Sequence, residues 1–361
     1  MIAEPAFISK AREKYGKTDN SSIFKYGLGI TSRFEAKESK AKGFLEVEIN
    51  GKRITAEETW KNPEFAKHFL GSIETRNNLM AANLKFLNSI AFIKIPQGKD
   101  AGTVHVKIQG TDSYSYILVI AEKESRGTIV EETIGENCYR SSIIEIIADE
   151  NSNIKYASVQ KAKNGQNYSY RKATLQKNAQ IEWLDIQTGS TVKTETETEL
   201  FGEGSSCNSY TVFFGAGNEA FDLYTKANHI GKNTHSRMNT SGALSGSAKA
   251  IQESFAKINK TAYGASAHQK SKILLLSREA KASPIPKLEI DNNDVAATHQ
   301  ASVGRIDAEK IFYMMSRGLS EKQAKQAYVE GFFEQYTSTI DVMEIKEDVR
   351  KIIEEKMENE H

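Results

Sequence analysis

The spacing of apolar and polar residues changes twice along the chain and divides it into three regions. Residues 1–90 place most apolar side chains at helical spacing, and one alternating stretch around Asn50-Gly51 indicates a β-hairpin. Residues 91–303 consist of short strand-like runs between polar turns, without a convincing helix. Residues 304–361 return to helical spacing. The pattern therefore predicts a mainly β core between an N-terminal, mostly helical region and a C-terminal helical region.

The β region contains a weak repeat of about 27 residues. Two sets of equivalent positions carry it: Ile154, Ile181, Cys207 and His235, and then Tyr168, Thr194, Phe221 and Ala248. Each unit holds at least two strands, as expected for a solenoid rung that buries its apolar face by stacking on its neighbours. The repeat favours a parallel β-solenoid, although a large β-sandwich or barrel also fits the alternation.

Helices are expected at both ends of the chain. Two are predicted over 56–69 and 72–90, and the last over about 342–358. Between them, Asp307 is a plausible N-cap and Gly318 a plausible end for a helix whose expected buried stripe is Ile311, Phe312, Met315 and Leu319. The next helix is expected to begin with a capping box formed by Ser320 and Gln323. The aromatic side chains of this region serve either as core or as a partner surface.

Charge, hydropathy and cysteine content exclude several classes of protein. The balance of 48 Lys plus Arg against 47 Asp plus Glu disfavours a nucleic-acid binder. The longest apolar runs are too short to span a bilayer, and the N-terminal residues lack an export signal. Cys138 and Cys207 form neither a disulfide framework nor a zinc motif, and each is more typical of a small buried side chain. We therefore expect a cytoplasmic protein without nucleic-acid or membrane partners.

The chain lacks the sequence motifs of nucleotide binding and hydrolysis. Gly231-Lys232 is followed by Asn233, where a phosphate-binding loop requires a hydroxyl side chain. We therefore expect that any ATP is bound by another chain and that this chain is not an enzyme. His229 and His235 flank the same turn, where they could approach each other or act as hydrogen-bonded turn residues.

His299 is the main candidate for metal chemistry. Its neighbours Ala296, Ala297, Thr298, Ala301 and Ser302 are small, which leaves the imidazole uncrowded. A neutral imidazole binds iron or zinc and can move protons near neutral pH. The alternative is a structural histidine at the junction between the β region and the helix at Asp307. The nearby acidic residues, Glu289, Asp291 and Asp294, are more typical of a solvated turn than of a metal cage.

Three segments resemble the SufB/SufD family of iron–sulfur cluster assembly proteins. They are KLEIDNNDVAATHQASVGRIDAEKIFYMMSRGLSEKQAKQAYVEGFF (287–333), ANHIGKNTHS (227–236) and NLKFLNSIAFIKIPQG (83–98). The resemblance implies a right-handed parallel β-helix flanked by helical regions. It also implies a non-enzymatic subunit of a SUF-type assembly complex, which works with a SufC-like ABC ATPase.

The resemblance further implies where partners and the cluster bind. The ATPase is expected to dock on the C-terminal helical region, with Phe312, Tyr313, Arg317, Gly318 and Phe332 as contact residues. A second SufB/SufD-like subunit, identical or different, is expected to pair with this chain. A transient iron–sulfur cluster is expected near that interface, with His299 as a candidate ligand and Gln300 beside it.

The chain departs from the family pattern at three positions. SufB carries a sulfur-accepting cysteine about thirty residues before the histidine, but the corresponding stretch of this chain, 266–277, has none, and Gln269 is near the expected place. SufB places Glu after the histidine, where this chain has Gln300, and SufD often has a cysteine at the position of Ala297. The segment VGRIDAEKIFY resembles SufD more than SufB. Any sulfur ligand is therefore expected to come from another chain or molecule. A structural adaptor without a metal role remains the alternative, and a β-helix polysaccharide lyase or hydrolase is disfavoured because no carboxylates recur at one rung position.

Overall fold

The computed structural model describes residues 47–358 except for 75–76, 110–111, 135–138, 161–164, 190 and 338–342, together with residue 13 and residues 21–23 and 33–35. The two N-terminal segments, β1 (Ser21–Ile23) and β2 (Arg33–Glu35), form a small antiparallel sheet. Within the described residues, no helix is both long enough and apolar enough to cross a membrane.

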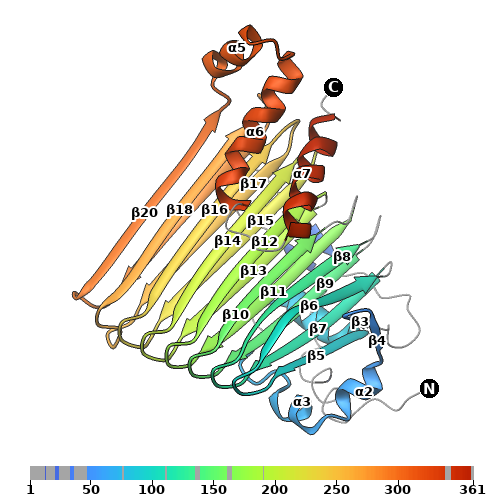
Figure 1. Ribbon diagram of the computed structural model, residues 1–361, viewed down its shortest axis with the longest axis vertical. Coiled ribbons are helices and arrows are strands. Elements are labelled where there is room, and N and C mark those ends of the chain that lie inside the picture. The colour runs from blue at the N-terminus through green and yellow to red at the C-terminus, as the bar shows by residue number, and fades with distance from the viewer. Residues whose placement is uncertain are drawn as a thin grey trace.

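The core is a parallel β-solenoid of about eight turns, in which successive strands alternate between two sheets (Figure 1). Sheet 1 contains β6 (Asp100–Gln109), β8 (Arg126–Ile134), β10 (Asn153–Gln160), β12 (Gln180–Thr188), β14 (Ser206–Gly215), β16 (His235–Leu244), β18 (Ala265–Leu275) and β20 (Val295–Arg305). Sheet 2 contains β5 (Ser89–Ile95), β7 (Asp112–Ala121), β9 (Tyr139–Ala148), β11 (Gln166–Leu175), β13 (Thr191–Leu200), β15 (Ala220–His229), β17 (Lys249–Ile258) and β19 (Lys281–Ile290). The predicted solenoid is therefore confirmed over the sandwich or barrel.

The predicted hairpin adds an antiparallel edge to sheet 1 at its N-terminal end. It consists of β3 (Val47–Ile49) and β4 (Lys52–Ile54), and β3 also pairs with β6. Asn50 and Gly51 have φ angles of 50° and 76°. Positive φ at both central residues is what a two-residue type I′ turn requires, so the Asn-Gly signal identified this turn correctly.

The register of the strands corrects the repeat in detail. Ile154, Ile181 and Cys207 are paired as predicted, but Cys207 pairs with Ser236 and not with His235. In the second set, Tyr168 pairs with Lys193 instead of Thr194. The starting residues of the paired sheet 2 strands, Gln166, Thr191, Ala220 and Lys249, are separated by 25, 29 and 29 positions. A constant spacing fails because the turns between strands differ in length.

Helices cover the outer faces of both sheets. α2 (Ala56–Trp60), α3 (Pro63–His68) and α4 (Asn78–Phe86) pack on the outer face of sheet 2, against tyrosines that include Tyr114, Tyr116 and Tyr168. α6 (Glu321–Thr337) and α7 (Met343–Glu358) lie on the outer face of sheet 1 (Figure 1). The first predicted N-terminal helix divides at Asn62-Pro63, because Asn62 caps a new helix and Pro63 occupies its first position.

The second predicted helix is shorter than expected at both ends. Asn77 caps α4 by accepting a hydrogen bond from the Met80 backbone N–H, so the helix starts after residue 72. It ends at Phe86, and Ser89–Ile95 forms β5, paired with β7. The apolar residues at the end of the predicted helix therefore belong to the first strand of the solenoid.

α5 (Ala308–Ser316) extends beyond the C-terminal end of β20 and does not lie on either sheet (Figure 1). Asp307 caps it as predicted by accepting a hydrogen bond from the Glu309 backbone N–H, 3.0 Å away. The predicted buried stripe is wrong for three of its four members. Ile311 is buried, but Phe312, Met315 and Leu319 are exposed, because no sheet lies under this helix.

The interior of the solenoid contains a buried ion pair among its apolar residues. Arg171 lies on β11, and its Nη2 is 3.0 Å from Asp185 Oδ1 on β12 and 3.0 Å from Ser158 Oγ on β10. Both charged side chains are less than 10% exposed. Asp185 also accepts a hydrogen bond of 2.6 Å from Gln187. These contacts satisfy charges that would otherwise be costly inside the protein.

Candidate functional site

His299 lies in the middle of β20, at the last position of a row that crosses the inner face of sheet 1. Strand pairing aligns the members of this row in order: Ile129, Tyr156, Trp183, Ser209, Met238, Gln269 and His299. Every member before His299 is buried, whereas His299 is exposed, because no further rung covers it. We call β19 and β20 the terminal rung. His299 therefore belongs to the open end of the solenoid and not to the junction with the helix.

The surroundings of His299 leave its imidazole accessible. Ala297 and Ala301 flank it on the same face of β20, and they pair with Ala267 and Ser271 of the strand behind. Among the described residues, His299 has no hydrogen bond or ion pair. The small neighbours that suggested an uncrowded imidazole in the sequence therefore do surround it. An exposed imidazole of this kind can accept a metal ion from outside the chain.

Gln269 is the immediate neighbour of His299 on β18. Its side chain is buried, and Nε2 donates a 2.8 Å hydrogen bond to the backbone oxygen of Lys287. Its Oε1 is buried without a hydrogen-bond partner. Because adjacent strands lie about 4.8 Å apart, Gln269 places an amide next to the imidazole.

Gln300 is not brought together with His299. Successive side chains of a strand point to opposite faces, so Gln300 lies on the outer face of sheet 1, where its pairing partner is Lys270. His299 and Gln300 therefore face different surroundings. Gln269 is the residue beside His299, and it can be identified only from the pairing register of β18 and β20.

Among the described residues, the cysteine Cys207 adds no ligand to this site. Cys207 is buried on β14, and burial raises the pKa of its thiol, so it remains protonated. Its Sγ lies 3.3 Å from Thr198 Oγ1. Cys138 lies outside the residues that the structure describes. The described part of the chain also contains no group of three or more His, Cys, Asp or Glu side chains that could hold a metal ion.

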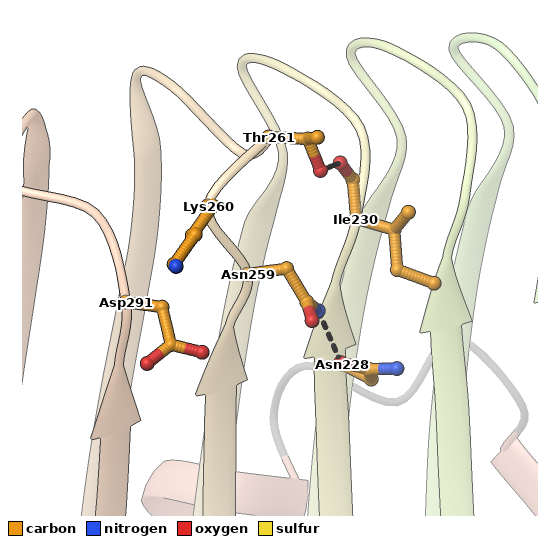
Figure 2. Close-up of a pocket in the computed structure, with 6 residues that line it drawn as sticks. All are labelled: Asn228, Ile230, Asn259, Lys260, Thr261 and Asp291. Atoms are coloured by element: carbon orange, nitrogen blue, oxygen red, sulfur yellow. Dashed lines mark hydrogen bonds between the residues drawn. The ribbon is translucent and has the colours of Figure 1, made fainter.

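The acidic turn beside the terminal rung adjoins a shallow hollow formed by the last turns of sheet 2 (Figure 2). Most of the polar groups that line this hollow form hydrogen bonds between neighbouring turns. Asn259 Nδ2 donates to Asn228 Oδ1 at 2.7 Å, and Thr261 Oγ1 donates to the Ile230 backbone oxygen at 2.7 Å. Lys260 and Asp291 line the same hollow from neighbouring turns. The arrangement supports the solenoid turns and does not resemble a metal cage.

His229 and His235 do not form a joint site. His229 is buried, and its Nδ1 lies 2.9 Å from Thr234 Oγ1, while its Nε2 lies 2.8 Å from Ser236 Oγ. Thr234 donates its own hydroxyl proton to the Gly231 backbone oxygen. Nδ1 therefore carries the histidine proton, and Nε2 accepts from Ser236. His235 contacts Ser266 instead, so His229 is the hydrogen-bonded turn residue that the sequence allowed.

The buried position of His229 predicts a pH dependence of stability. Burial, with a smaller effect from His235, lowers the pKa of His229 from 6.5 to about 4. The unfolded chain then binds the extra proton more readily than the folded one, so stability falls as pH drops below 6.5. Between pH 7 and pH 5 we expect a loss of about 2 kcal/mol in the free energy of unfolding from this group. Urea denaturation at both pH values measures it, and His229→Gln should remove this part of the loss, whereas His268→Gln should retain it.

A second candidate surface lies on α5 and the turn that follows it. Phe312 and Tyr313 are 73% and 58% exposed. The Arg317 guanidinium lies 5.2 Å from the centre of the Tyr313 ring, and its Nη2 donates to Tyr313 Oη at 3.2 Å. Gly318 has a φ of 101°, which allows the chain to turn toward α6. Four of the five predicted partner residues are therefore contiguous, and Met315 and Leu319 extend the surface.

Phe332 is the fifth predicted partner residue and lies elsewhere. It is half-buried on α6, where its ring centre is 5.2 Å from that of Phe333, and it packs with the apolar contacts between α6, α7 and sheet 1. The predicted capping box at the start of this helix is confirmed, because the Ser320 N–H donates to Gln323 Oε1 and the Gln323 N–H donates to Ser320 Oγ.

Comparison with known proteins places these features in one family. Residues 104–332 match the family model described as SUF system FeS cluster assembly, SufBD core domain. The chain is 29% identical to the iron–sulfur cluster assembly protein SufD of Bacillus subtilis, over 78% of this chain and 67% of that protein. It is 24% identical to an iron–sulfur cluster assembly SufBD family protein of Staphylococcus haemolyticus, over 98% of this chain and 79% of that protein. The matched region includes the terminal rung and α5.

Proposed function

This chain belongs to the SufBD family of the SUF system for iron–sulfur cluster assembly, and from that membership we propose that it is a non-enzymatic, SufD-like subunit of the assembly complex. In this proposal it pairs with a second SufB/SufD-like subunit and docks a SufC-like ABC ATPase. One observation carries the proposal: an uncovered solenoid end with an accessible imidazole is followed directly by a helix with an exposed apolar face. Each of these features requires a partner, and they are adjacent in the chain.

The proposed docking site for the ATPase is the surface of Phe312, Tyr313, Met315, Arg317 and Leu319. Exposed aromatic and arginine side chains are the residue types that dominate binding energy at protein interfaces. α5 has no sheet beneath it, so these side chains gain no burial within this chain. Contact with a partner is the arrangement that removes their apolar surface from water.

Replacing both Phe312 and Tyr313 with alanine is expected to weaken ATPase binding about 30-fold or more, because two central aromatic contacts are lost. Isothermal titration with the purified SufC-like ATPase measures the effect. The matched control is Phe201→Ala with Tyr263→Ala, which removes a similarly exposed pair, 57% and 53%, from the solenoid turns. Equal binding by the two double variants and the unaltered chain would contradict docking at α5.

The proposed pairing surface is the terminal rung, and β20 is its more suitable edge. β19 contains Pro284 and Pro286, which lack the N–H groups that strand addition requires. β20 contains no proline, so its outer edge keeps its donors and acceptors. Ile290 and Val303 are 42% and 40% exposed at this end. A second solenoid placed against the end would cover both residues and extend the sheet.

Val303→Lys is expected to weaken subunit pairing about ten-fold or more, because it places a charge on the inner face of the terminal rung, which a partner rung would cover. Sedimentation velocity of the chain with its partner subunit measures the change. Val303→Ala is the conservative control, and it should retain most of the association. The monomer's melting temperature should stay close to that of the unaltered chain, since Val303 is already partly in water. Unchanged association of the lysine variant would exclude this end as the interface.

In this proposal the cluster is cargo, assembled between the subunits. His299 contributes one nitrogen ligand from this chain at the open end of the inner row. Gln269 helps to shape the site but supplies no thiolate. The sulfur ligands come from the partner or from the sulfur donor, because the cysteine in the described part of this chain, Cys207, is buried on β14 as a protonated thiol. The role of this chain is therefore to complete a site, to hold its partner in register and to connect that site to the ATPase.

A further inference from the structure

The outer face of sheet 1 carries a group of basic side chains on β16 and β18, two of its last four strands. β14, β16, β18 and β20 contain no Asp or Glu. Arg237 on β16 and Lys270 and Lys272 on β18 point outward, together with His235 and His268. We call these five residues the basic face. The chain as a whole has 48 basic and 47 acidic residues, so this group departs from its overall balance.

The cations of the basic face have no internal counter-charge. Among the described residues, Arg237, Lys270 and Lys272 take part in no ion pair or hydrogen bond. His268 contacts only Thr298, with Nδ1 2.8 Å from Oγ1, so its Nε2 points away without a partner. Glu182 on β12 is the nearest carboxylate along the sheet, two strands from Arg237. Among the described residues, no carboxylate therefore pairs with the cations of this face.

The outer face of sheet 2 shows that the fold does not require this arrangement. Three lysines there pair with carboxylates of the neighbouring strand: Lys193 with Asp222 at 2.8 Å, Lys257 with Glu289 at 2.6 Å, and Lys287 with Glu253 at 2.9 Å. Both faces belong to the same solenoid. These three lysines have carboxylate partners, whereas among the described residues the cations of the basic face have none.

We propose that the basic face binds an extended acidic segment of a partner protein. Lys270 and Lys272 are separated by one strand repeat, about 6.8 Å, and an extended peptide with carboxylates at every second residue has the same repeat. Arg237 and His268 lie on adjacent strands, so they extend the positively charged surface across the sheet. The exposed Thr298, Gln300 and Ser302 of β20 offer hydroxyl and amide groups along its edge. Gln300 therefore lies on this surface and not with His299.

The chemistry of the face distinguishes this occupant from other anions. A single-stranded nucleic acid needs aromatic platforms for its bases, and Tyr210 is the only aromatic side chain on the polar part of these four strands. A membrane surface needs apolar anchors beside the cations, and the row from Asn208 through Arg237 and His268 to Thr298 has none. An isolated phosphate needs converging donors in a concave site, whereas these side chains stand on one sheet face.

The test uses the full chain and a fluorescein-labelled peptide of alternating Glu and Ser residues. Fluorescence polarisation is expected to show binding that weakens about ten-fold as salt is raised from about 50 to 300 mM. Lys270→Glu with Lys272→Glu should weaken it about ten-fold or more at the lower salt. Lys257→Glu with Lys287→Glu makes the same charge change on sheet 2 and should alter it less than about two-fold.

Three results would overturn the proposal. They are no binding by the unaltered chain, equal weakening by both double variants, or tighter binding of oligothymidylate or phosphatidylserine vesicles than of the peptide. Thermal unfolding confirms that each variant is folded, and Arg237→Glu, at an exposed position, repeats the test if the β18 variant is not. The measurement needs only the isolated chain. Its outcome therefore does not depend on whether ATPase docking or subunit pairing is confirmed.

Discussion

Replacing His299 with alanine is expected to reduce cluster assembly by the reconstituted complex about ten-fold or more, because it removes the nitrogen ligand that we propose at the subunit junction. The side chain is exposed and has no hydrogen bond or ion pair among the described residues, so the free energy of unfolding should stay within about 0.5 kcal/mol. Anaerobic reconstitution with the partner subunit and the ATPase, followed by visible absorption and iron analysis, measures the loss.

His268→Ala is the matched control for His299→Ala. His268 lies on the adjacent strand but on the outer face of sheet 1, so the two variants remove the same side chain from opposite sides of one sheet. Only the His299 variant should lose assembly. If both variants assemble clusters normally, this chain is a structural adaptor whose terminal rung has no metal role. If both fail equally, the cause is general damage to the end of the solenoid and not a missing ligand.

Arg171→Ala is expected to lower the free energy of unfolding by about 3–5 kcal/mol, because it leaves Asp185 buried without its ion-pair partner. Ser158 would also lose its hydrogen bond with the guanidinium. Chemical denaturation followed by circular dichroism measures the change. Lys123→Ala is the control, since it breaks an ion pair of 3.0 Å with Glu150 that is exposed on the surface. That variant should cost much less than Arg171→Ala, because an ion pair exposed to solvent contributes little to stability.

A double variant separates the charge from the shape of the side chain. Arg171→Met with Asp185→Leu removes both buried charges and keeps much of the volume, so it should be considerably more stable than Arg171→Ala. A double variant as unstable as the single one would mean that the hydrogen-bond network, and not the unpaired carboxylate, dominates the loss. The two explanations therefore predict different orders of stability for the unaltered chain, Arg171→Ala and the double variant.

Features encoded by a few neighbouring residues could be predicted from the sequence. The Asn50-Gly51 turn, the Asp307 cap and the Ser320–Gln323 box depend on local hydrogen bonds and backbone angles, and the structure contains all three. The solenoid was predictable because each rung repeats the same alternation of strand and turn. The register of its strands was harder to predict, because one turn of different length shifts the positions of all later strands.

Features that depend on distant neighbours could not be predicted. The apolar stripe of α5 looked like core, but whether it is buried depends on where the end of β20 directs the chain. The side of the sheet that His299 faces follows from its pairing with Gln269, which is thirty residues earlier in the sequence. Gln300 was assigned to the same site because it is adjacent in sequence, although strand geometry separates the two side chains.

The uncovered end of the solenoid also links folding to association. In a stack of rungs, each unit is stabilised by two neighbours, but β19 and β20 have a neighbour on one side only. The last rung is therefore the part of the stack most prone to local opening, and His299 is held by it. A subunit that binds there supplies the missing neighbour and shifts the equilibrium toward the closed strand. The placement of the imidazole and the binding of a subunit at this end are thus thermodynamically coupled, so we expect His299 to be most rigidly held when the proposed partner is bound.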